Sequence, residues 1–478
     1  MVGLAVELHR LALEVRADRP RDLLHPHQVI VREHVVPELC HEDHVRMHHE
    51  AQWRPVLISC ISPTTQVRTV ALMQLRYSFR LYPNHAQRGA LARAFGCARV
   101  VFNDAVRARE DARAVGGPFP KAGELSTRLI TQAKQTEARS WLGEVSAVVL
   151  QQSLRDAETA YKNFFASLKG ERKGPKLGAP RFKSRKDARQ SIRFTANARW
   201  SVTDSGRLSL PKIGPVKVKW SRILPTTPTS VTVIKDAAGR YFASFVIDTD
   251  PAADAARTPD SDQSVGIDLG LTHFAILDDG TKIDSPRFLR RAEKKLKKAQ
   301  RELSRKQKGS KNREKARLKV ARAHAQVADA RREFHHQLST KLIRENQAIG
   351  VEDLAVNALA RTPLAKSVHD AGWSQFVAML VYKADRYGRT LIKIGRFVPT
   401  SQTCSHCDHV EGPKPLHIRE WTCPACGALL DRDINSARNV KKAAGLAESA
   451  CGAPIRPESV LAQRNEAGSH GFPPKASA

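Results

Sequence analysis

The stretches CSHC at residues 404–407, CPAC at residues 423–426 and DRDIN at residues 431–435 combine two kinds of metal-binding chemistry in one segment. Fifteen residues separate the two C-x-x-C pairs. Four thiolates at this spacing close a tetrahedral zinc shell with no open position, which makes a structural site. The carboxylates of Asp431 and Asp433 suit the opposite kind of ion, a hard Mg²⁺ or Mn²⁺. The predicted zinc ligands are Cys404, Cys407, Cys423 and Cys426.

The predicted zinc segment allows two interpretations. It could act as a ribbon that contacts nucleic acid or braces a catalytic strand. It could equally be a staple for a small loop that has little core of its own. The sequence leaves both interpretations open.

The charge of the chain is strongly positive and unevenly distributed. Lys plus Arg number 79 against 48 Asp plus Glu, a net charge of +31. Residues 1–72 hold 8 Arg against 9 acidic residues, a balance of −1, so residues 73–478 hold 71 basic against 39 acidic residues, a balance of +32. An excess of this size fits a polyanionic partner such as nucleic acid.

Membrane and secretory classes do not fit the sequence. No segment has the roughly 18 uninterrupted apolar residues that a membrane span needs. Glu7, His9 and Arg10 interrupt the apolar N-terminal residues, which argues against a signal peptide. We therefore expect a cytoplasmic protein with no membrane partner.

Hydrophobic periodicity predicts the main elements. Residues 75–82 alternate apolar with polar or basic side chains, as a half-buried strand does, and residues 85–115 and 145–168 have helical spacing. Short strands follow up to residue 247. Residues 286–345 predict two charge-rich helices folded back on each other along narrow apolar seams.

Asp268 lies in the apolar stretch VGIDLG, residues 265–270. A carboxylate in an apolar strand is costly unless something pairs with it, and a divalent cation is a natural partner. Gly266 and Gly270 lack side-chain bulk, so we expect a phosphate backbone to approach closely there.

Two further candidate acids each have a rival. Glu352 and Asp353 follow a short apolar run, and strand alternation sends neighbouring side chains to opposite faces, so only one can join a cluster with Asp268. Asp431 and Asp433 stand at a predicted helix start, where Asp431 is well placed as the cap. The residues by themselves leave both choices open.

Together these acids suggest one reaction. Clustered carboxylates raise one another's pKa values unless cations neutralise them. Two Mg²⁺ ions about 3.5–4 Å apart would stabilise the attacking and leaving oxygens of a phosphodiester hydrolysis. The sequence offers no motif for a Ser or Cys nucleophile. We therefore expect metal-dependent cleavage of nucleic acid.

From Met73 to about Val440 the chain resembles the TnpB family, also called OrfB, which insertion sequences encode. Residues 1–72 match nothing in the family pattern, and Met73 is a candidate start. The stretches that carry the resemblance are LRYSFRLYP at 75–83, VGIDLG at 265–270, VEDL at 351–354, YKA at 382–384, YG at 387–388, TSQTC at 400–404 and DRDINSA at 431–437.

The resemblance implies an RNA-guided, Mg²⁺- or Mn²⁺-dependent DNA endonuclease of a transposable element, similar to ancestors of type V CRISPR effectors. It implies that Asp268, Glu352 and Asp433 are the catalytic acids and bind the magnesium. Its partners would be a guide RNA from the same locus and a double-stranded DNA target, near the bacterial nucleoid. Position 436 is Ser where the family often has Ala, and we expect this to be harmless.

The fold implied by the resemblance is α/β plus β, with an RNase H-like RuvC nuclease domain that contains a zinc ribbon insertion, and an N-terminal β-barrel with a helical lobe. The expected parts are an extension of open role at 1–72, the nucleic-acid-binding barrel and lobe at 73–250, a linker at 251–263, the RuvC-like domain at 264–441 with its ribbon at 400–430, and a disordered tail at 442–478.

Two other functions stay open on the sequence. A guided DNA binder without cleavage would be a regulator, although the intact set of acids argues against it. A transposase that joins DNA strands could also use three acids, and the resemblance disfavours it.

Overall fold

The structure is a computed structural model, and it describes residues 32–34 and 70–446 apart from residues 173, 188, 257, 259 and 416. The chain forms two compact units, which are Met1–Pro251 with Lys295–Gln326 and Ala252–Lys294 with Val327–Ala478. Most of the predictions for residues 1–72, and those for the tail after residue 446, lie outside the described residues.

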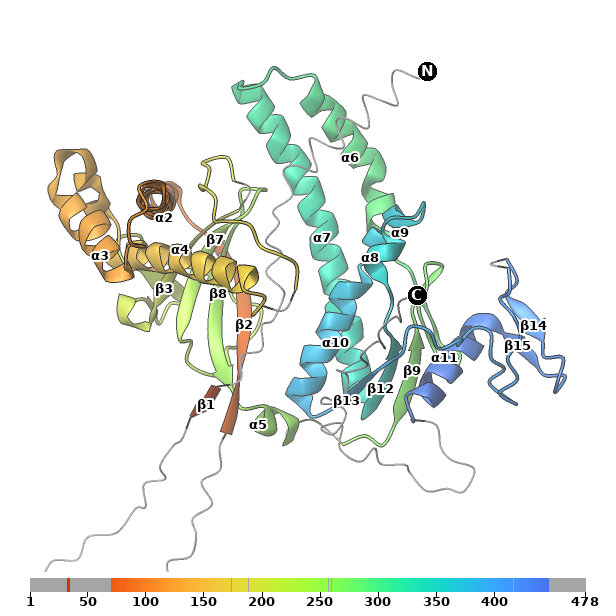
Figure 1. The fold of residues 1–478 in the computed structure, drawn as a ribbon. Coiled ribbons are helices and arrows are strands. Elements are labelled where there is room, and N and C mark those ends of the chain that lie inside the picture. The colour runs from red at the N-terminus through yellow and green to blue at the C-terminus, as the bar shows by residue number, and fades with distance from the viewer. Residues whose placement is uncertain are drawn as a thin grey trace, which may run out of the picture. The chain divides into compact units, whose positions relative to one another are not determined.

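In the first unit, β2 (Val70–Tyr82) runs through the middle of an eight-stranded sheet (Figure 1). It pairs antiparallel with β8 (Tyr241–Thr249) and β6 (Gly214–Lys219). Phe79 and Leu81 are buried on one face, as the predicted alternation requires. The sheet order is β3-β7-β8-β2-β6-β5-β4, with β1 beside β2. The other strands are β1 (Arg32–His34), β3 (Gln190–Thr195), β4 (Ser201–Val202), β5 (Arg207–Leu210) and β7 (Ser230–Lys235).

Two long helices, α2 (His85–Ala114) and α4 (Ala147–Leu168), share one apolar core with this sheet, and both were predicted. The start of α2 is closed by a reciprocal cap. Asn84 Oδ1 accepts from Gln87 N at 2.9 Å, and Gln87 Oε1 accepts from Asn84 N at 3.0 Å, so two otherwise unpaired backbone donors are satisfied. The shorter helical pieces are α3 (Ala122–Ser126), η1 (Thr127–Gln132), η2 (Ala133–Gln135), η3 (Glu137–Glu144) and η4 (Ala196–Ala198).

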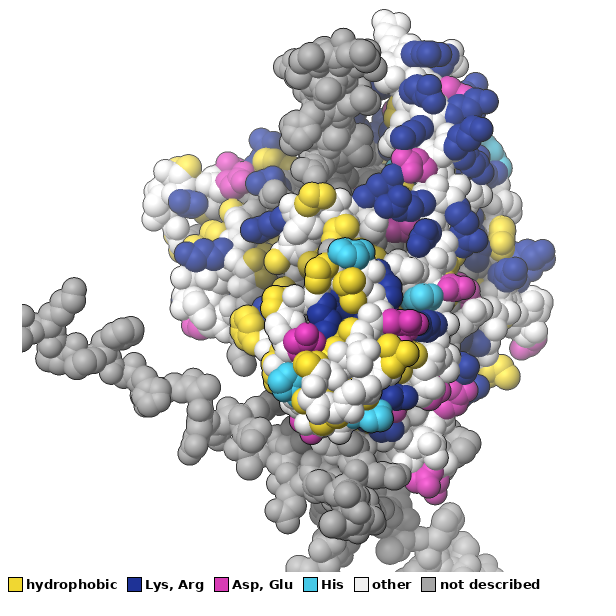
Figure 2. Space-filling model, turned by 90° about the vertical axis from the view of Figure 1, so that its right-hand side faces the viewer, with side chains coloured by type: hydrophobic (Ala, Val, Ile, Leu, Met, Phe, Trp, Pro, Cys, Tyr) yellow, Lys and Arg dark blue, Asp and Glu magenta, His cyan; other side chains and the backbone are white. Residues whose placement is uncertain are grey.

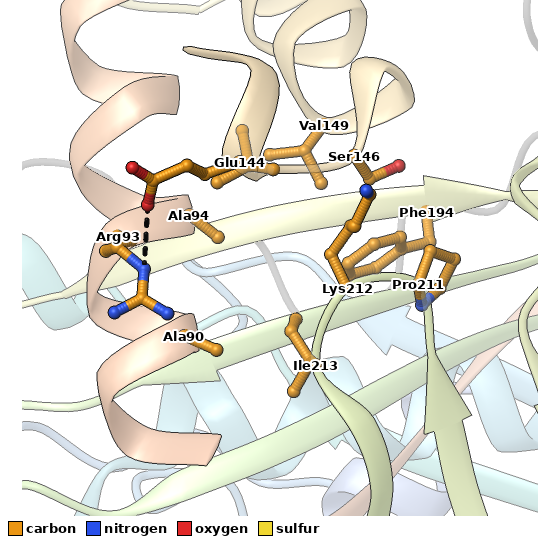
Figure 3. A pocket seen from close by; sticks show the side chains of 11 residues that line it. Ala90, Arg93, Ala94, Glu144, Ser146, Val149, Phe194, Pro211, Lys212 and Ile213 are labelled. Carbon is orange, nitrogen blue, oxygen red and sulfur yellow. Dashed lines mark ion pairs between the residues drawn. The ribbon is translucent and has the colours of Figure 1, made fainter. Parts of the chain in front are cut away.

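A small hollow lies beside α2 in this unit (Figure 3). Arg93 Nε and Glu144 Oε2 form an ion pair of 3.2 Å at its edge, and Phe194 and Ile213 are among the apolar side chains that line it. Both charged side chains are more than half exposed, so the pair contributes at most about 1 kcal/mol to stability. The hollow positions no group of the candidate site.

In the second unit, β9 (Ser264–Asp268) and β12 (Ala348–Glu352) are parallel neighbours in a five-stranded sheet ordered β11-β10-β9-β12-β13. Both strands are almost wholly apolar, as strands buried on both faces are. Helix α11 (Arg432–Ala443) packs on β9 and β12. The remaining strands of this sheet are β10 (His273–Leu277), β11 (Lys282–Asp284) and β13 (Thr390–Ile394).

The second unit has further elements around this sheet (Figure 1). They are the helices α8 (Val356–Leu359), α9 (Ala365–Ala371) and α10 (Trp373–Tyr387) and the two-stranded pair β14 (Glu420–Thr422) and β15 (Leu429–Asp431).

Residues expected to form a linker include a short helix, α5 (Pro251–Ala256). Alanine favours helix, and proline is tolerated at a first helical position. Asp254 Oδ2 accepts a hydrogen bond from Arg386 Nε of α10 at 2.7 Å, and both side chains are largely buried. The helix is therefore held in place by tertiary contact rather than left as free linker.

The predicted pair of charged helices is confirmed as α6 (Phe288–Ser304) and α7 (Lys311–Glu345). Lys295 Nζ of α6 donates to Gln326 Oε1 of α7 at 3.3 Å, as expected for two helices that run antiparallel beside each other. Lys and Arg side chains are numerous on the molecular face drawn in Figure 2. Among the described residues, none of the helices combines the length and apolar character that crossing a bilayer requires.

Candidate active site and cysteine cluster

Asp268 is the last residue of β9 and follows three buried residues of that strand. Its Oδ1 is 3.2 Å from the Ser436 hydroxyl of α11. Burial, together with the negative charges of Glu352 and Asp433, raises the pKa of Asp268 to about 7. The three acids, distant in sequence, therefore lie close enough to repel one another.

Glu352 and Asp353 point to different partners. Val351 pairs with Ile267 in the parallel register of β12 and β9, so the next residue of each strand, Glu352 and Asp268, also lie side by side. Glu352 Oε1 accepts from Thr400 Oγ1 at 2.6 Å. Asp353 Oδ2 instead accepts from Arg396 at 2.6 Å, with both side chains about half exposed.

Asp431 and Asp433 also separate. Asp431 Oδ1 accepts from the backbone nitrogens of Asp433 and Ile434, so it caps α11 as predicted. Its other oxygen lies 2.6 Å from Lys282 Nζ. Burial acts to raise the pKa of Asp431, but the bonds from Lys282 and from the two backbone nitrogens outweigh it and lower this pKa. Asp433, in the first turn, lies 3.4 Å from Arg419. Asp431 is therefore the helix cap, and the negative charge of Asp433 helps to raise the pKa of Asp268.

The acids form a more open group than the cysteines do. Within the described part of the chain, the four cysteines are the group whose metal-ligating atoms all lie within 4.8 Å of one another. The three carboxylates do not meet that condition, yet two of them influence the third electrostatically.

Gly266 has a role that differs from the expected one. A Cβ at Gly266 would lie 2.3 Å from Ala437 O and 2.6 Å from Lys441 N of α11. Its neighbour in register, Gly350, faces Ala444 and Val440 in the same way. The missing side chains therefore admit α11, and the space at Gly266 is filled by this helix rather than open to a phosphate backbone.

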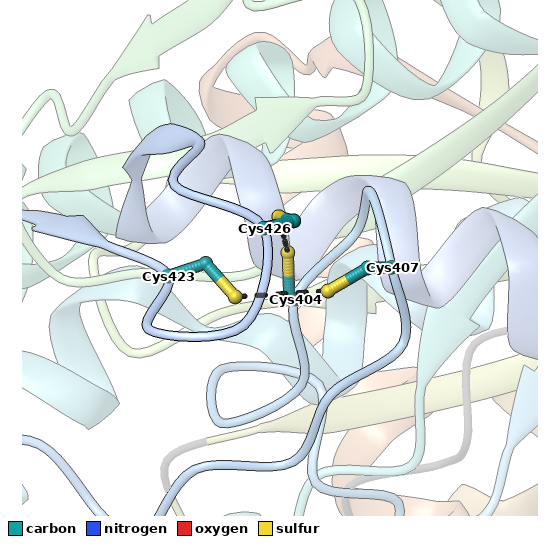
Figure 4. Close-up of side chains that lie close together, drawn as sticks. All are labelled: Cys404, Cys407, Cys423 and Cys426. Carbon is teal, nitrogen blue, oxygen red and sulfur yellow. Dashed lines mark hydrogen bonds between the residues drawn. The ribbon is translucent and has the colours of Figure 1, made fainter.

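The predicted cysteine cluster is present (Figure 4). Cys404 Sγ lies 3.8 Å from Cys426 Sγ, and Cys407 Sγ lies 3.6 Å from Cys423 Sγ. One cysteine of each C-x-x-C pair is buried and the other is exposed. Four sulfur atoms at these separations can hold a tetrahedral zinc ion.

The two cysteine turns have matching backbones. Asp408 and Gly427 each follow the second cysteine of a pair, and both have positive φ, 59° and 69°. Asp408 N bonds to Cys404 O, and Gly427 N bonds to Cys423 O. Asp and Gly tolerate this left-handed conformation better than most residues, so the local sequence builds two equivalent knuckles.

Asn435 and Asn439 of α11 tie the first knuckle to the acid site. The side-chain amides of both residues donate to the backbone oxygens of Thr400 and Thr403. Asn435 Oδ1 also accepts from Ser405 N at 2.7 Å. The segment that carries Cys404 is therefore fixed to the helix that carries Asp433.

Sequence reasoning missed four polar residues of this site. Thr400, Asn435, Ser436 and Asn439 are all buried. Thr400 and Ser436 contact the acids Glu352 and Asp268, respectively. The available signal was their polar character inside otherwise apolar or helical patterns, since buried polar groups need partners.

Three family models match the chain. Residues 244–362 match OrfB_IS605, described as "Probable transposase", and residues 373–440 match the TNB domain of Cas12f1-like proteins. Residues 73–117 match a helix-turn-helix domain, although the structure has a strand and one long helix, β2 and α2, over most of this range.

A protein of Streptomyces pristinaespiralis, named "Putative RNA-guided DNA endonuclease", is 44% identical over 388 residues, which cover 80% of this chain and 92% of the relative. The chain belongs to the TnpB family. InsQ of Escherichia coli K12, which carries the same description, is 31% identical to this TnpB protein over 79% of the chain and 93% of InsQ. The mimivirus "TnpB-like protein L79" is 24% identical over 24% of the chain and 23% of its own length.

Solved structures similar to this TnpB protein are distant. A chain in a cryo-EM structure of a Cas12f1–sgRNA–target DNA complex has a TM-score of 0.45 and 14% identity, over 74% of this chain and 82% of that one. The mini-RNA-guided endonuclease CRISPR-Cas_phi3 has a TM-score of 0.45 and 9% identity, over 79% and 93%. The family assignment does not depend on these likenesses.

Proposed function

We propose that this TnpB protein is an RNA-guided DNA endonuclease that hydrolyses DNA at Asp268, Glu352 and Asp433. One observation carries the proposal: the parallel register of β9 and β12 places Asp268 beside Glu352, and two hydroxyls, of Ser436 and Thr400, lie between their carboxylates. Burial and then the charges of Glu352 and Asp433 raise the pKa of Asp268. The names of the relatives at 44% and 31% identity support the activity. Active sites gather like charges in this way when cations are to bind there.

The carboxylates fit a hard divalent ion. Asp268, Glu352 and Asp433 offer only oxygen ligands, which Mg²⁺ and Mn²⁺ prefer. When bound there, such ions activate a water molecule and offset the charge that grows on the leaving oxygen. The protein's own contribution is to bring the carboxylates together from β9, β12 and α11, where Glu352 accepts a hydrogen bond from Thr400 and Asp268 accepts one from Ser436.

Each unit has a proposed part in the function. The five-stranded sheet with α11, in residues 264–441, would be the RNase H-like RuvC domain, and the cysteine segment at 400–430 its zinc ribbon. The part of the eight-stranded sheet that lies in residues 73–250, with its helices, would be the β-barrel and lobe that bind guide RNA and flanking DNA. The balance of +32 after residue 72 supports nucleic-acid partners, because neutralised phosphates release counterions.

The first prediction tests the acids with a neighbouring acid as control. We expect the protein, purified with RNA from its own locus, to cleave a matching duplex in Mg²⁺ and to be inactive in EDTA. Asp268→Asn should lower the cleavage rate by at least about a thousand-fold, because a catalytic metal loses a charged ligand. Asp353→Asn should retain activity, since Asp353 pairs with Arg396 and not with the cluster.

The products separate this function from the alternatives. Free cleaved ends indicate hydrolysis, whereas joined strands indicate a transposase. Guide-dependent binding by the wild type without cleavage in any divalent ion would indicate a regulator. Undiminished cleavage by Asp268→Asn would remove the site assignment.

A further inference from the structure

Two buried hydroxyls connect the acids of β9 and β12. The Ser436 hydroxyl lies 3.2 Å from Asp268 Oδ1 and 3.0 Å from the Thr400 hydroxyl. Thr400 Oγ1 in turn donates to Glu352 Oε1 at 2.6 Å. The result is a continuous row of oxygen contacts, Asp268–Ser436–Thr400–Glu352, in which the Thr400 proton goes to Glu352 and the single Ser436 proton goes either to Asp268 or to Thr400. The two middle members come from α11 and from the segment before the first knuckle.

The row is held at both of its middle positions. Ser436 is 3% exposed and Thr400 is 6% exposed, so water does not compete for these hydroxyls. The backbone oxygen of Thr400 accepts from the side chains of Asn435 and Asn439. Ser436 is part of α11, which lies against Gly266. The hydroxyls therefore have fixed positions, and the carboxylates must adapt to them.

We propose that Ser436 and Thr400 are positioning residues that set the spacing of Asp268 and Glu352 for divalent-ion binding. This inference rests on the proposed function, because it concerns the same acids. Two negative carboxylates on adjacent strands would otherwise turn away from each other. The hydrogen bonds from the two hydroxyls counter this repulsion. Removing a group that orients a metal ligand typically lowers metal affinity by about 10–100-fold.

Position 436 is Ser where the family often has Ala, and on this proposal the Ser436 hydroxyl has a role that an alanine could not fill. An alanine at 436 would remove the link between Asp268 and Thr400 while keeping the helix. Glu352 would retain its hydrogen bond from Thr400, so the predicted defect is in the relative placement of the two acids and not in either acid by itself.

The second prediction is a metal-binding experiment on the full-length protein with its co-purified RNA. Free Mn²⁺ is measured by electron paramagnetic resonance for the wild type, Asp268→Asn, Thr400→Val, Thr400→Ser and Ser436→Ala. We expect Thr400→Val and Ser436→Ala to weaken Mn²⁺ binding by about ten-fold. Thr400→Ser keeps the hydroxyl and should bind as the wild type does. In the double variant Thr400→Val/Ser436→Ala, the fold loss of Mn²⁺ affinity should not exceed the product of the two single losses. It should be smaller than that product if the two hydroxyls act as a unit.

Cleavage supplies a second readout. The Mg²⁺ concentration for half-maximal cleavage should rise in Thr400→Val and Ser436→Ala, while the rate at saturating Mg²⁺ changes little. Thermal unfolding and zinc content establish that each variant is folded. The proposal is overturned if Thr400→Val and Ser436→Ala both bind Mn²⁺ with wild-type affinity. It is also overturned if Asp268→Asn binds Mn²⁺ as tightly as the wild type does. Mn²⁺ binding that follows the predicted pattern in a protein that never cleaves DNA would overturn the proposed function and leave the positioning role standing.

Discussion

Asp431 and Asp433 stand two residues apart and have different environments because a helix begins between them. Asp431, with extended backbone, turns its oxygen to the first helical nitrogens and to Lys282. Asp433 lies in the helix, 3.4 Å from Arg419, and its negative charge acts on Asp268. At the residue scale, neighbouring acids have different partners: Asp353 forms a 2.6 Å ion pair with Arg396, whereas Glu352 accepts a hydrogen bond from Thr400.

His335 of α7 is a residue whose environment makes stability depend on pH. It is fully buried, its Nε2 lies 2.9 Å from Ala371 O, and burial lowers its pKa to about 4. Phe274 and Phe376 surround its ring. The ring is therefore neutral in the folded protein at pH 7.

The third prediction follows from this lowered pKa. Between pH 6.5 and 4 the unfolded chain takes up a proton that folded His335 does not, so the stability present above pH 6.5 is lost as the pH falls. At pH 5 the loss amounts to about 2 kcal/mol. His335→Gln can keep the bond to Ala371 O, and it should reduce the difference in unfolding free energy between pH 7 and pH 5 by about that amount.

Denaturant titrations at the two pH values measure this difference. His85→Gln, at the exposed start of α2, is the matched control and should leave the difference as it is in the wild type. An unchanged pH dependence in His335→Gln would contradict the assignment.

At the scale of elements, the cysteine knuckles, α11 and the parallel strands support one another. Asn435 and Asn439 fix the segment from Thr400 to Ser405 onto α11. Gly266 and Gly350 let α11 lie close to β9 and β12. A disturbance of the knuckle should therefore reach the acids through Thr400.

The fourth prediction concerns zinc. We expect one zinc ion per chain, and loss of that ion in Cys404→Ser, because a thiolate ligand is removed. Amides from 403 to 410 should then exchange hydrogen faster, and cleavage should fall by at least about ten-fold as Thr400 loses its fixed position. Elemental analysis and hydrogen exchange measure the two effects.

Cys97→Ala is the control for this experiment, because Cys97 is a buried free thiol in α2 outside the cluster. This variant should keep its zinc. If Cys404→Ser retained full zinc content, or if zinc loss left both exchange and cleavage unchanged, the supporting role of the knuckle would be wrong.

At the scale of the whole molecule, positive charge is the dominant property. The balance after residue 72 is +32, and the turn between α6 and α7 is rich in exposed lysine. Nucleic-acid affinity should therefore fall steeply with salt, because each neutralised phosphate releases counterions. Long-range charge also accelerates association.

The fifth prediction tests this turn. Replacing the exposed Lys306, Lys308 and Lys311 with Gln should weaken RNA binding and reduce the slope of log affinity against log salt by up to about 2–3, since each phosphate contact contributes roughly 0.7–0.9. Filter binding at several salt concentrations measures the slope. The same three positions changed to Arg keep the charge and should keep the slope. An unaltered slope in the Gln variant would mean that this turn does not contact RNA.

The sequence by itself determined the features that depend on local spacing. Periodicity predicted β2, α2, α4 and the α6–α7 pair, and the cysteine spacing predicted the sulfur cluster, because residues a few positions apart have nearly fixed relative geometry. Only the tertiary structure showed that Asp353 and Asp431 pair with Arg396 and Lys282 while Glu352 and Asp433 add negative charge at Asp268, what fills the space at Gly266, and that Ser436 and Thr400 lie between Asp268 and Glu352. These features depend on partners more than a hundred residues away in several cases, and their positions follow from strand register and helix packing, which local sequence does not encode.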